Sequence, residues 1–141
     1  MTFGLSRTAA NGREGVRVRS FGELEQAIMD VVWADHAPRT VREVLERLND
    51  GRAQPLAYNT VQTVMEILHR KEWLARAKSG RAFSYRATKS REEYAASLID
   101  QVWATGADRT ATLVRLFDEL GPGERAELRA ALAERAGGER A

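Results

Sequence analysis

The stretch of sequence that decides the fold is residues 57–88, which reads AYNTVQTVMEILHRKEWLARAKSGRAFSYRAT. In its first half, apolar residues recur at the spacing of one helix face. These residues are Val61, Val64, Met65 and Leu68. In its second half, the runs LARAKS and AFSYRA alternate apolar with polar or basic residues around a Ser-Gly-Arg turn, which is typical of a β-hairpin. The stretch therefore predicts a helix over residues 57–71, followed directly by a basic hairpin.

This region also concentrates the positive charge of the chain. The whole chain has a formal net charge of +2, but residues 66–89 carry seven basic side chains against two acidic ones. A local basic patch is the electrostatic footprint expected of a protein that binds a polyanion. A solvated charged face with no partner is the other interpretation, and charge alone does not choose between the two.

Two amphipathic helices are predicted before this stretch. In the first, FGELEQAIMDVVWADHAP, we expect Ser20 to be the N-cap, Glu23 to complete a capping box and Pro38 to end the segment. Its apolar face comprises Leu24, Ala27, Ile28, Val31 and Val32. In the second, VREVLERLND, we expect Thr40 to be the N-cap and Glu43 its capping-box partner. Its apolar face comprises Val41, Val44, Leu45 and Leu48.

Three helices followed by a basic hairpin predict a winged helix-turn-helix over residues 21–89. The third helix of such a domain lies in the major groove, where Asn, Gln and Thr side chains can recognise base edges. The candidate base-reading residues are Asn59, Thr60, Gln62 and Thr63. The candidates for contacts to the DNA backbone are Thr40, Arg42, Tyr58, Arg70, Arg76, Lys78 and Arg81. A solvated surface or a protein-binding platform is the alternative interpretation of the same helix face, and packing on the wing is the alternative for Tyr58.

Four aromatic residues are expected in the core and not as stacking platforms for nucleic acid, because each lies on an apolar face. They are Trp33, Trp73, Phe83 and Tyr85.

The regions on either side of the winged helix have different compositions. Residues 1–20 contain four arginines and one glutamate without periodicity, which predicts a flexible basic arm. Residues 90–141 follow a purely helical pattern, and a helical tail of this length is too small to enclose a core alone. The apolar residues that need a partner surface are Leu98, Val102, Leu113, Leu116, Phe117, Leu120, Leu128 and Leu132. We expect residues 90–141 to form a homodimer, with a folded-back monomer as the alternative, and a two-fold dimer would place two recognition helices about one DNA turn apart.

Composition argues against an enzyme or a metalloprotein. The chain has no cysteine and only two histidines, His36 and His69, so no metal site and no cofactor are expected. No Ser/His/Asp arrangement, glycine-rich phosphate loop or paired carboxylates with a base is evident. No apolar run has the length of a membrane span or of a signal peptide, so we expect a cytoplasmic protein that is nucleoid-associated when bound to DNA.

Four motifs together closely resemble the BlaI/MecI penicillinase-repressor family across residues 22–120. They are IMDVVW in the first helix, TVREV in the second, AYNTVQTVM in the third and GRAFSYRA in the hairpin. The resemblance implies a homodimeric repressor of β-lactamase or related genes that binds a palindromic operator. It also implies a C-terminal three-helix dimerisation region, with helices at 91–104, 108–120 and 123–135.

The resemblance has two departures. Some members are inactivated by cleavage of an Asn-Phe bond in the second C-terminal helix, where this chain has Leu116-Phe117, so the resemblance does not support inactivation by a protease here. The copper-responsive members carry C-terminal cysteines, which this chain lacks. Two other functions fit the same pattern: a winged-helix regulator with an inducer pocket, and a winged-helix adaptor that binds protein.

Overall fold

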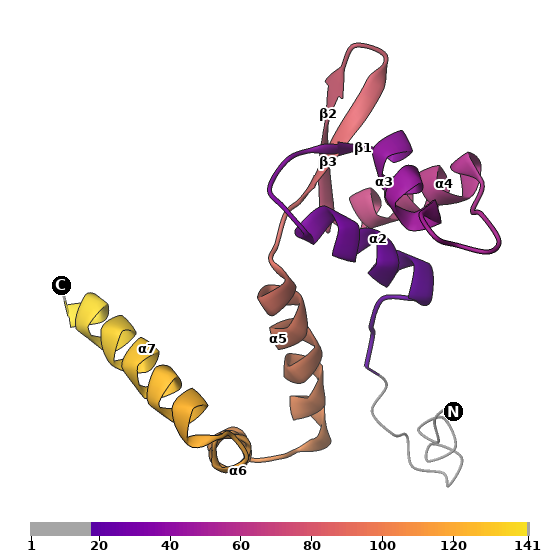
Figure 1. The fold of residues 1–141 in the computed structure, drawn as a ribbon. Helices are drawn as coiled ribbons and strands as arrows, with labels where there is room; N and C mark the ends of the chain where they lie inside the picture. The colour runs from indigo at the N-terminus through magenta and orange to yellow at the C-terminus, as the bar shows by residue number, and fades with distance from the viewer. Residues whose placement is uncertain (1–17, 141) are drawn as a thin grey trace, which may run out of the picture. The chain divides into compact units, whose positions relative to one another are not determined.

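The computed structural model describes residues 18–140, with side chains described to residue 138, and divides into two compact units between Gln101 and Val102 (Figure 1). The proposed arm of residues 1–20 therefore lies almost wholly outside the described residues. The elements of the first unit are α2 (Glu23–Trp33), β1 (Arg39–Thr40), α3 (Val41–Asn49), α4 (Tyr58–Arg70), β2 (Leu74–Ser79), β3 (Ala82–Ala87) and α5 (Arg91–Val102), which ends one residue beyond the boundary. This order confirms the mainly helical winged helix-turn-helix fold.

The wing is a three-stranded antiparallel sheet with strand order β1-β3-β2. Strands β2 and β3 form the expected hairpin, in which Ser79 pairs with Ala82 and Gly80 has a φ of 65°. A positive φ at the first loop residue suits glycine and matches the twist of a tight hairpin. Strand β1 was not predicted: it is only two residues long and pairs Arg39 with Tyr85 and Thr40 with Ser84.

The core of the first unit forms where the apolar faces of α2, α3 and α4 meet the base of the hairpin. Its buried residues are Ile28, Met29, Val32, Val41, Val44, Val61, Met65, Leu68, Leu74 and Tyr85. The predicted inward faces of the three helices are confirmed, with Val64 and Leu45 packing at the margin. Met29 is fully buried although the predicted stripe left it out.

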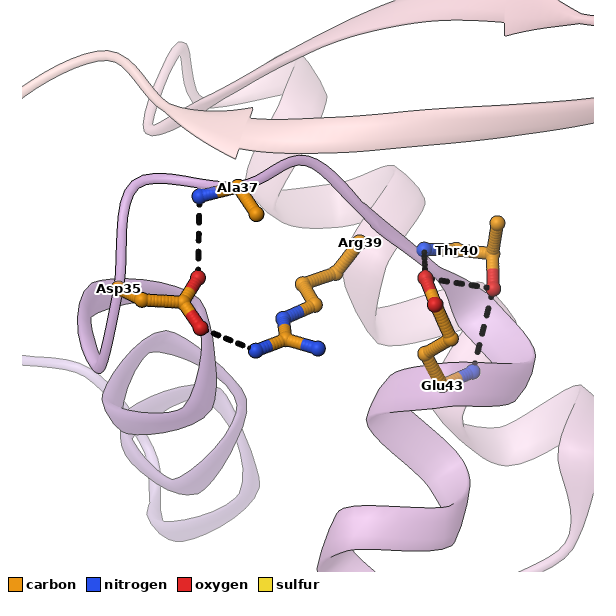
Figure 2. A network of polar contacts seen from close by, with 5 residues as sticks. All are labelled: Asp35, Ala37, Arg39, Thr40 and Glu43. Carbon is orange, nitrogen blue, oxygen red and sulfur yellow. Dashed lines mark hydrogen bonds and ion pairs between the residues drawn. The ribbon is translucent and has the colours of Figure 1, made fainter.

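Figure 2 shows how α3 begins. The Glu43 N–H donates to Thr40 Oγ1 at 3.2 Å, and the Thr40 N–H donates to Glu43 Oε1 at 2.8 Å, which confirms the predicted capping box. In the connection before it, Asp35 accepts a hydrogen bond from the Ala37 N–H at 3.0 Å and pairs with Arg39. The Ala37 hydrogen bond and the Arg39 charge hold the pKa of Asp35 below its ordinary value. These contacts hold the chain where it enters β1 and α3.

The predicted cap of the first helix was wrong. The N-cap of α2 is Gly22, not Ser20, and its N–H donates to Glu25 Oε1 at 2.9 Å. The reason is a tertiary contact, because the Phe21 N–H donates to the Tyr94 hydroxyl at 2.6 Å and the two rings stack at 4.1 Å. Phe21 is thus held in a position that keeps residues 18–22 out of the helix.

Helix α5 packs on the winged helix through an aromatic cluster of Phe21, Trp33, Trp73 and Tyr94. Tyr94, on α5, is 7% exposed, and its ring meets Trp73 edge-on at 5.3 Å and Trp33 at 5.9 Å. Beside the cluster, the Trp33 indole N–H donates to the Lys89 carbonyl at 2.8 Å. The first compact unit therefore extends to Gln101, beyond the domain boundary expected at residue 89.

The second unit contains η2 (Trp103–Thr105), α6 (Arg109–Asp118) and α7 (Pro122–Arg140). Asp108 caps α6 by accepting the Ala111 N–H at 2.9 Å. Helix α7 was expected to end before Gly137, but it continues through Gly137 and Gly138 because neither glycine takes the left-handed conformation that ends a helix. Within residues 18–140, no helix is long and apolar enough to cross a membrane.

Glu72, two residues after the end of α4, has a strained left-handed backbone conformation that allows a test of local stability. The Trp73 N–H donates to the Leu68 carbonyl and the Glu72 N–H to the His69 carbonyl, which is a Schellman motif with Glu72 at the left-handed position, φ 69°. We expect Glu72→Gly to raise the free energy of unfolding by about 0.5–1 kcal/mol, since glycine takes this conformation without steric cost. Urea unfolding measures the change. Arg70→Gly, at the last residue of α4, is the control and should destabilise the protein; a loss of stability in Glu72→Gly would contradict the prediction.

Candidate nucleic-acid interface

The outer face of α4 carries the predicted base-reading residues. Asn59, Thr60 and Thr63 are exposed and Gln62 is half-buried. The opposite face of α4 is anchored in the core by Val61, Met65 and Leu68, each with no exposed surface. The helix is therefore rigidly supported from one side and displays hydrogen-bonding side chains on the other, as a recognition helix must.

The turn between α3 and α4 is held by a side chain that the sequence analysis did not identify. Asn49 Nδ2 donates to the Leu56 carbonyl at 3.1 Å, and the Leu56 N–H donates to Asn49 Oδ1 at 2.8 Å. Because both bonds join the end of α3 to the residue two positions before α4, Asn49 fixes where the chain enters α4. Its position in a helix-ending Asn-Asp-Gly sequence was the available signal.

A groove of about 470 Å³ runs between α3, α4 and the wing. It is lined by Thr40, Val41, Arg42, Tyr58, Gln62, Glu66, Arg81, Ala82, Phe83 and Tyr85. The structure thus brings five predicted DNA-contact residues to one surface hollow: Thr40, Arg42, Tyr58, Gln62 and Arg81. The other six do not line it: Asn59, Thr60, Thr63, Arg70, Arg76 and Lys78.

Two arginines beside this groove lie over aromatic rings. The guanidinium carbon of Arg76 is 4.2 Å from the centre of the Phe83 ring, and that of Arg42 is 5.3 Å from the centre of the Tyr58 ring. Arg76 Nη1 also donates to the Tyr85 hydroxyl at 3.3 Å. The core prediction for Phe83 was wrong, because its ring is 38% exposed. The residue lies on the core-facing side of the hairpin but too close to the wing tip for the helices to cover it.

The remaining aromatic predictions are confirmed, fully or in part. Tyr85 is buried at 1% exposure, while Trp33 and Trp73 are half-buried and pack against the core. Tyr58 is 38% exposed, with its ring under Arg42. The basic residues Arg70, Lys78 and Arg81 are exposed, at the end of α4 and at the tip of the wing.

One salt bridge joins the C-terminal end of α4 to α2. Lys71 Nζ lies 2.8 Å from Glu25 Oε2. Burial raises the pKa of Glu25, but the hydrogen bonds from Lys71 and the Gly22 N–H, with the charge of Lys71, together lower it below the ordinary value. This pair therefore contributes stability above the unfolded-state pKa of Glu25 and loses it as the pH falls through the folded-state pKa.

A second cleft, of about 480 Å³, lies beside the end of α2 and the start of α5. Its lining includes Trp33 but also charged side chains of both signs, among them Asp35, Arg86, Lys89 and Glu92. Small-molecule sites are predominantly apolar, so this cleft does not resemble the inducer pocket that the alternative function requires. Among the residues that the structure describes, no cluster of three or more His, Asp or Glu side chains is placed to hold a metal ion.

Comparison with known proteins identifies the family. The sequence profile of the Penicillinase repressor family matches residues 21–134, which is most of the chain. The chain belongs to the penicillinase repressor family. It is 37% identical over 121 residues to the transcriptional regulator BlaI of Mycobacterium tuberculosis strain H37Rv. The aligned residues cover 84% of this chain and 86% of that protein. The protein is accordingly a transcriptional regulator of the penicillinase-repressor type and not an enzyme.

Solved structures of penicillinase repressors are also similar. The solution structure of the DNA-binding domain of the repressor BlaI is 26% identical, with a TM-score of 0.46, and covers 55% of this chain and 92% of that one. The monomeric form of Bacillus licheniformis BlaI, in complex with the blaP half-operator, is 24% identical, with a TM-score of 0.43, over 55% of this chain and 92% of that one.

Proposed function

We propose that this protein is a homodimeric repressor that binds a palindromic operator in the cytoplasm through α4 and the wing. The observation that carries the proposal is the two-sided nature of α4: one face is fixed in the core, and the other presents Asn59, Thr60 and Thr63 beside a groove lined by Arg42 and Arg81. In this proposal, the amide and hydroxyl groups on α4 read base edges, and the basic side chains neutralise phosphates.

Dimerisation is supported by the exposed apolar side chains of the last three long helices. The large hydrophobic residues that are at least one-third exposed there are Ile99, Val102, Leu113, Val114, Leu116, Leu128 and Leu132. The predicted interface residues Leu98, Phe117 and Leu120 are half-buried, while Ile99 and Val114 were not in the predicted set. Exposed leucines at this density are typical of a helix surface that is covered in an assembly.

The test is binding of the purified protein to labelled fragments of the region upstream of its own gene, at two salt concentrations with nonspecific competitor. Competitor-resistant binding to a palindromic site, with steep salt dependence, would support the proposal. A winged-helix adaptor that binds protein would show no salt-dependent affinity for DNA. This result would overturn the proposed DNA-binding function.

Arg81 tests the phosphate contacts of the wing. Arg81→Ala should weaken binding to all DNA sequences and reduce the slope of log affinity against log salt by about one, because one fewer phosphate is neutralised. Fluorescence anisotropy over a salt series measures this slope. Arg135→Ala, on the exposed surface of α7, is the control and should leave the slope unchanged. An unaltered slope in Arg81→Ala would rule out this role.

Thr60 and Thr63 test the reading of bases. Thr60→Ala and Thr63→Ala should each cost about 1–3 kcal/mol at particular base pairs of the operator and leave nonspecific affinity nearly unchanged. Selection from a randomised operator library, followed by sequencing, shows the positions affected. Thr110→Ala, an exposed threonine on α6, serves as the matched control. The proposed reading face would be wrong if both α4 variants kept the parent's operator preference.

A further inference from the structure

Two arginines lie at the groove between α3, α4 and the wing: Arg42 lines it, and Arg76 lies over the Phe83 ring, which lines it. Arg42 comes from the first turn of α3 and lies over Tyr58, and Arg76 comes from β2 and lies over Phe83. Both rings are 38% exposed, so they contribute less to the core than buried aromatic residues do. Both rings also line the groove itself. The arrangement pairs each ring with one guanidinium at the edge of the surface proposed to bind DNA.

The hydrogen-bonding edges of these two arginines are largely unused within the protein. In the described part of the chain, the ion pairs are made by Arg39, Lys71 and Arg91, and neither Arg42 nor Arg76 pairs with a carboxylate. A guanidinium that lies over a ring face keeps its N–H groups at its rim, where a phosphate can accept two parallel hydrogen bonds. For Arg76, the bond from Nη1 to the Tyr85 hydroxyl adds a second restraint.

We propose that Phe83 and Tyr58 are positioning residues that hold Arg76 and Arg42 ready for the backbone phosphates of DNA bound at the groove. An unrestrained arginine loses several side-chain torsions when it binds a phosphate, and a preorganised one loses fewer. Phe83 lies near the wing tip, where the helices do not cover it, so its ring face is available to Arg76. The inference rests on the proposed DNA-binding function.

The test is a double-mutant cycle between Phe83 and Arg76. The probe is a labelled DNA duplex of mixed sequence, about 30 base pairs long so that it spans both half-sites of a dimer. Phosphate contacts are independent of sequence, so the operator need not be known. Arg76→Gln should weaken binding of the full-length parent about tenfold. In the Phe83→Leu background the same change should weaken binding only about two- to fivefold, because the unheld guanidinium contributes less.

Two controls separate positioning from packing and from direct contact. Phe83→Trp retains a ring face and should keep the parent's affinity, whereas Phe83→Leu should not. Arg70→Gln, at the opposite end of α4 from Tyr58, should have the same effect in both backgrounds. The thermal unfolding midpoint of Phe83→Leu should match that of the parent, since the residue is outside the buried core.

The outcomes distinguish this inference from the function on which it rests. If the parent binds the duplex with salt dependence and Arg76→Gln has equal effects in both backgrounds, the inference is overturned and the DNA-binding function stands. If Phe83→Trp loses as much affinity as Phe83→Leu, the ring face is not the cause and the inference is also overturned. If the parent shows no salt-dependent binding, both the function and the inference are wrong.

Discussion

Leu116→Glu is expected to convert the protein to a monomer and to weaken its binding to a palindromic operator by about 100-fold or more. Leu116 is 43% exposed on α6, and the proposed dimer covers it. Burying a carboxylate in an apolar interface without a partner costs more than the lost leucine contact alone. In a dimer, binding of one winged helix to its half-site gives the other winged helix a high effective concentration at the second half-site. This gain is lost when the dimer dissociates. Light scattering after size exclusion measures the mass, and anisotropy measures the affinity.

Ala111→Glu is the matched control for this experiment. Ala111 is exposed in the first turn of α6, on the side away from the leucine face, and a carboxylate there interacts favourably with the helix N-terminus. Helical content should be the same in both variants and in the parent. A dimeric Leu116→Glu protein with the parent's affinity would show that α6 does not form the interface.

Tyr94→Ala is expected to reduce the free energy of unfolding by about 3 kcal/mol or more, as for other large aromatic residues truncated in a core. The substitution removes a ring that stacks on Phe21 at 4.1 Å and meets Trp73 at 5.3 Å, and it leaves the Phe21 N–H without its acceptor. Urea unfolding followed by tryptophan fluorescence measures the loss, since Trp33 and Trp73 belong to the same cluster.

Tyr94→Phe separates packing from hydrogen bonding. It keeps the stacked ring and removes only the acceptor for the Phe21 N–H, so the expected loss is about 1 kcal/mol. Tyr58→Ala, at a ring that is 38% exposed, should cost less than Tyr94→Ala. If Tyr94→Ala unfolds at the parent's urea concentration, the aromatic cluster does not hold α5 to the winged helix.

Much of the candidate interface could be predicted because it depends on local periodicity. The spacing of Val61, Met65 and Leu68 decides which face of α4 enters the core, and Asn59, Thr60 and Thr63 follow on the other face by geometry. What the periodicity could not predict is the contacts that side chains make between α3, the turn after it and α4. The stacking of Arg42 on Tyr58 and the hydrogen bonds between Asn49 and Leu56 both depend on how α3 meets α4.

The sequence by itself determined the elements whose stabilising contacts lie within a few residues. These are the amphipathic helices, the Thr40–Glu43 capping box and the tight hairpin at Gly80. Only the tertiary structure decided that α2 begins after Phe21, that Arg39 and Thr40 form a strand, and that α5 joins the winged helix. The physical reason is range: capping bonds and helical stripes are fixed by local chain geometry. The Phe21–Tyr94 stack and the β1–β3 pairing form only when distant segments have already been brought together.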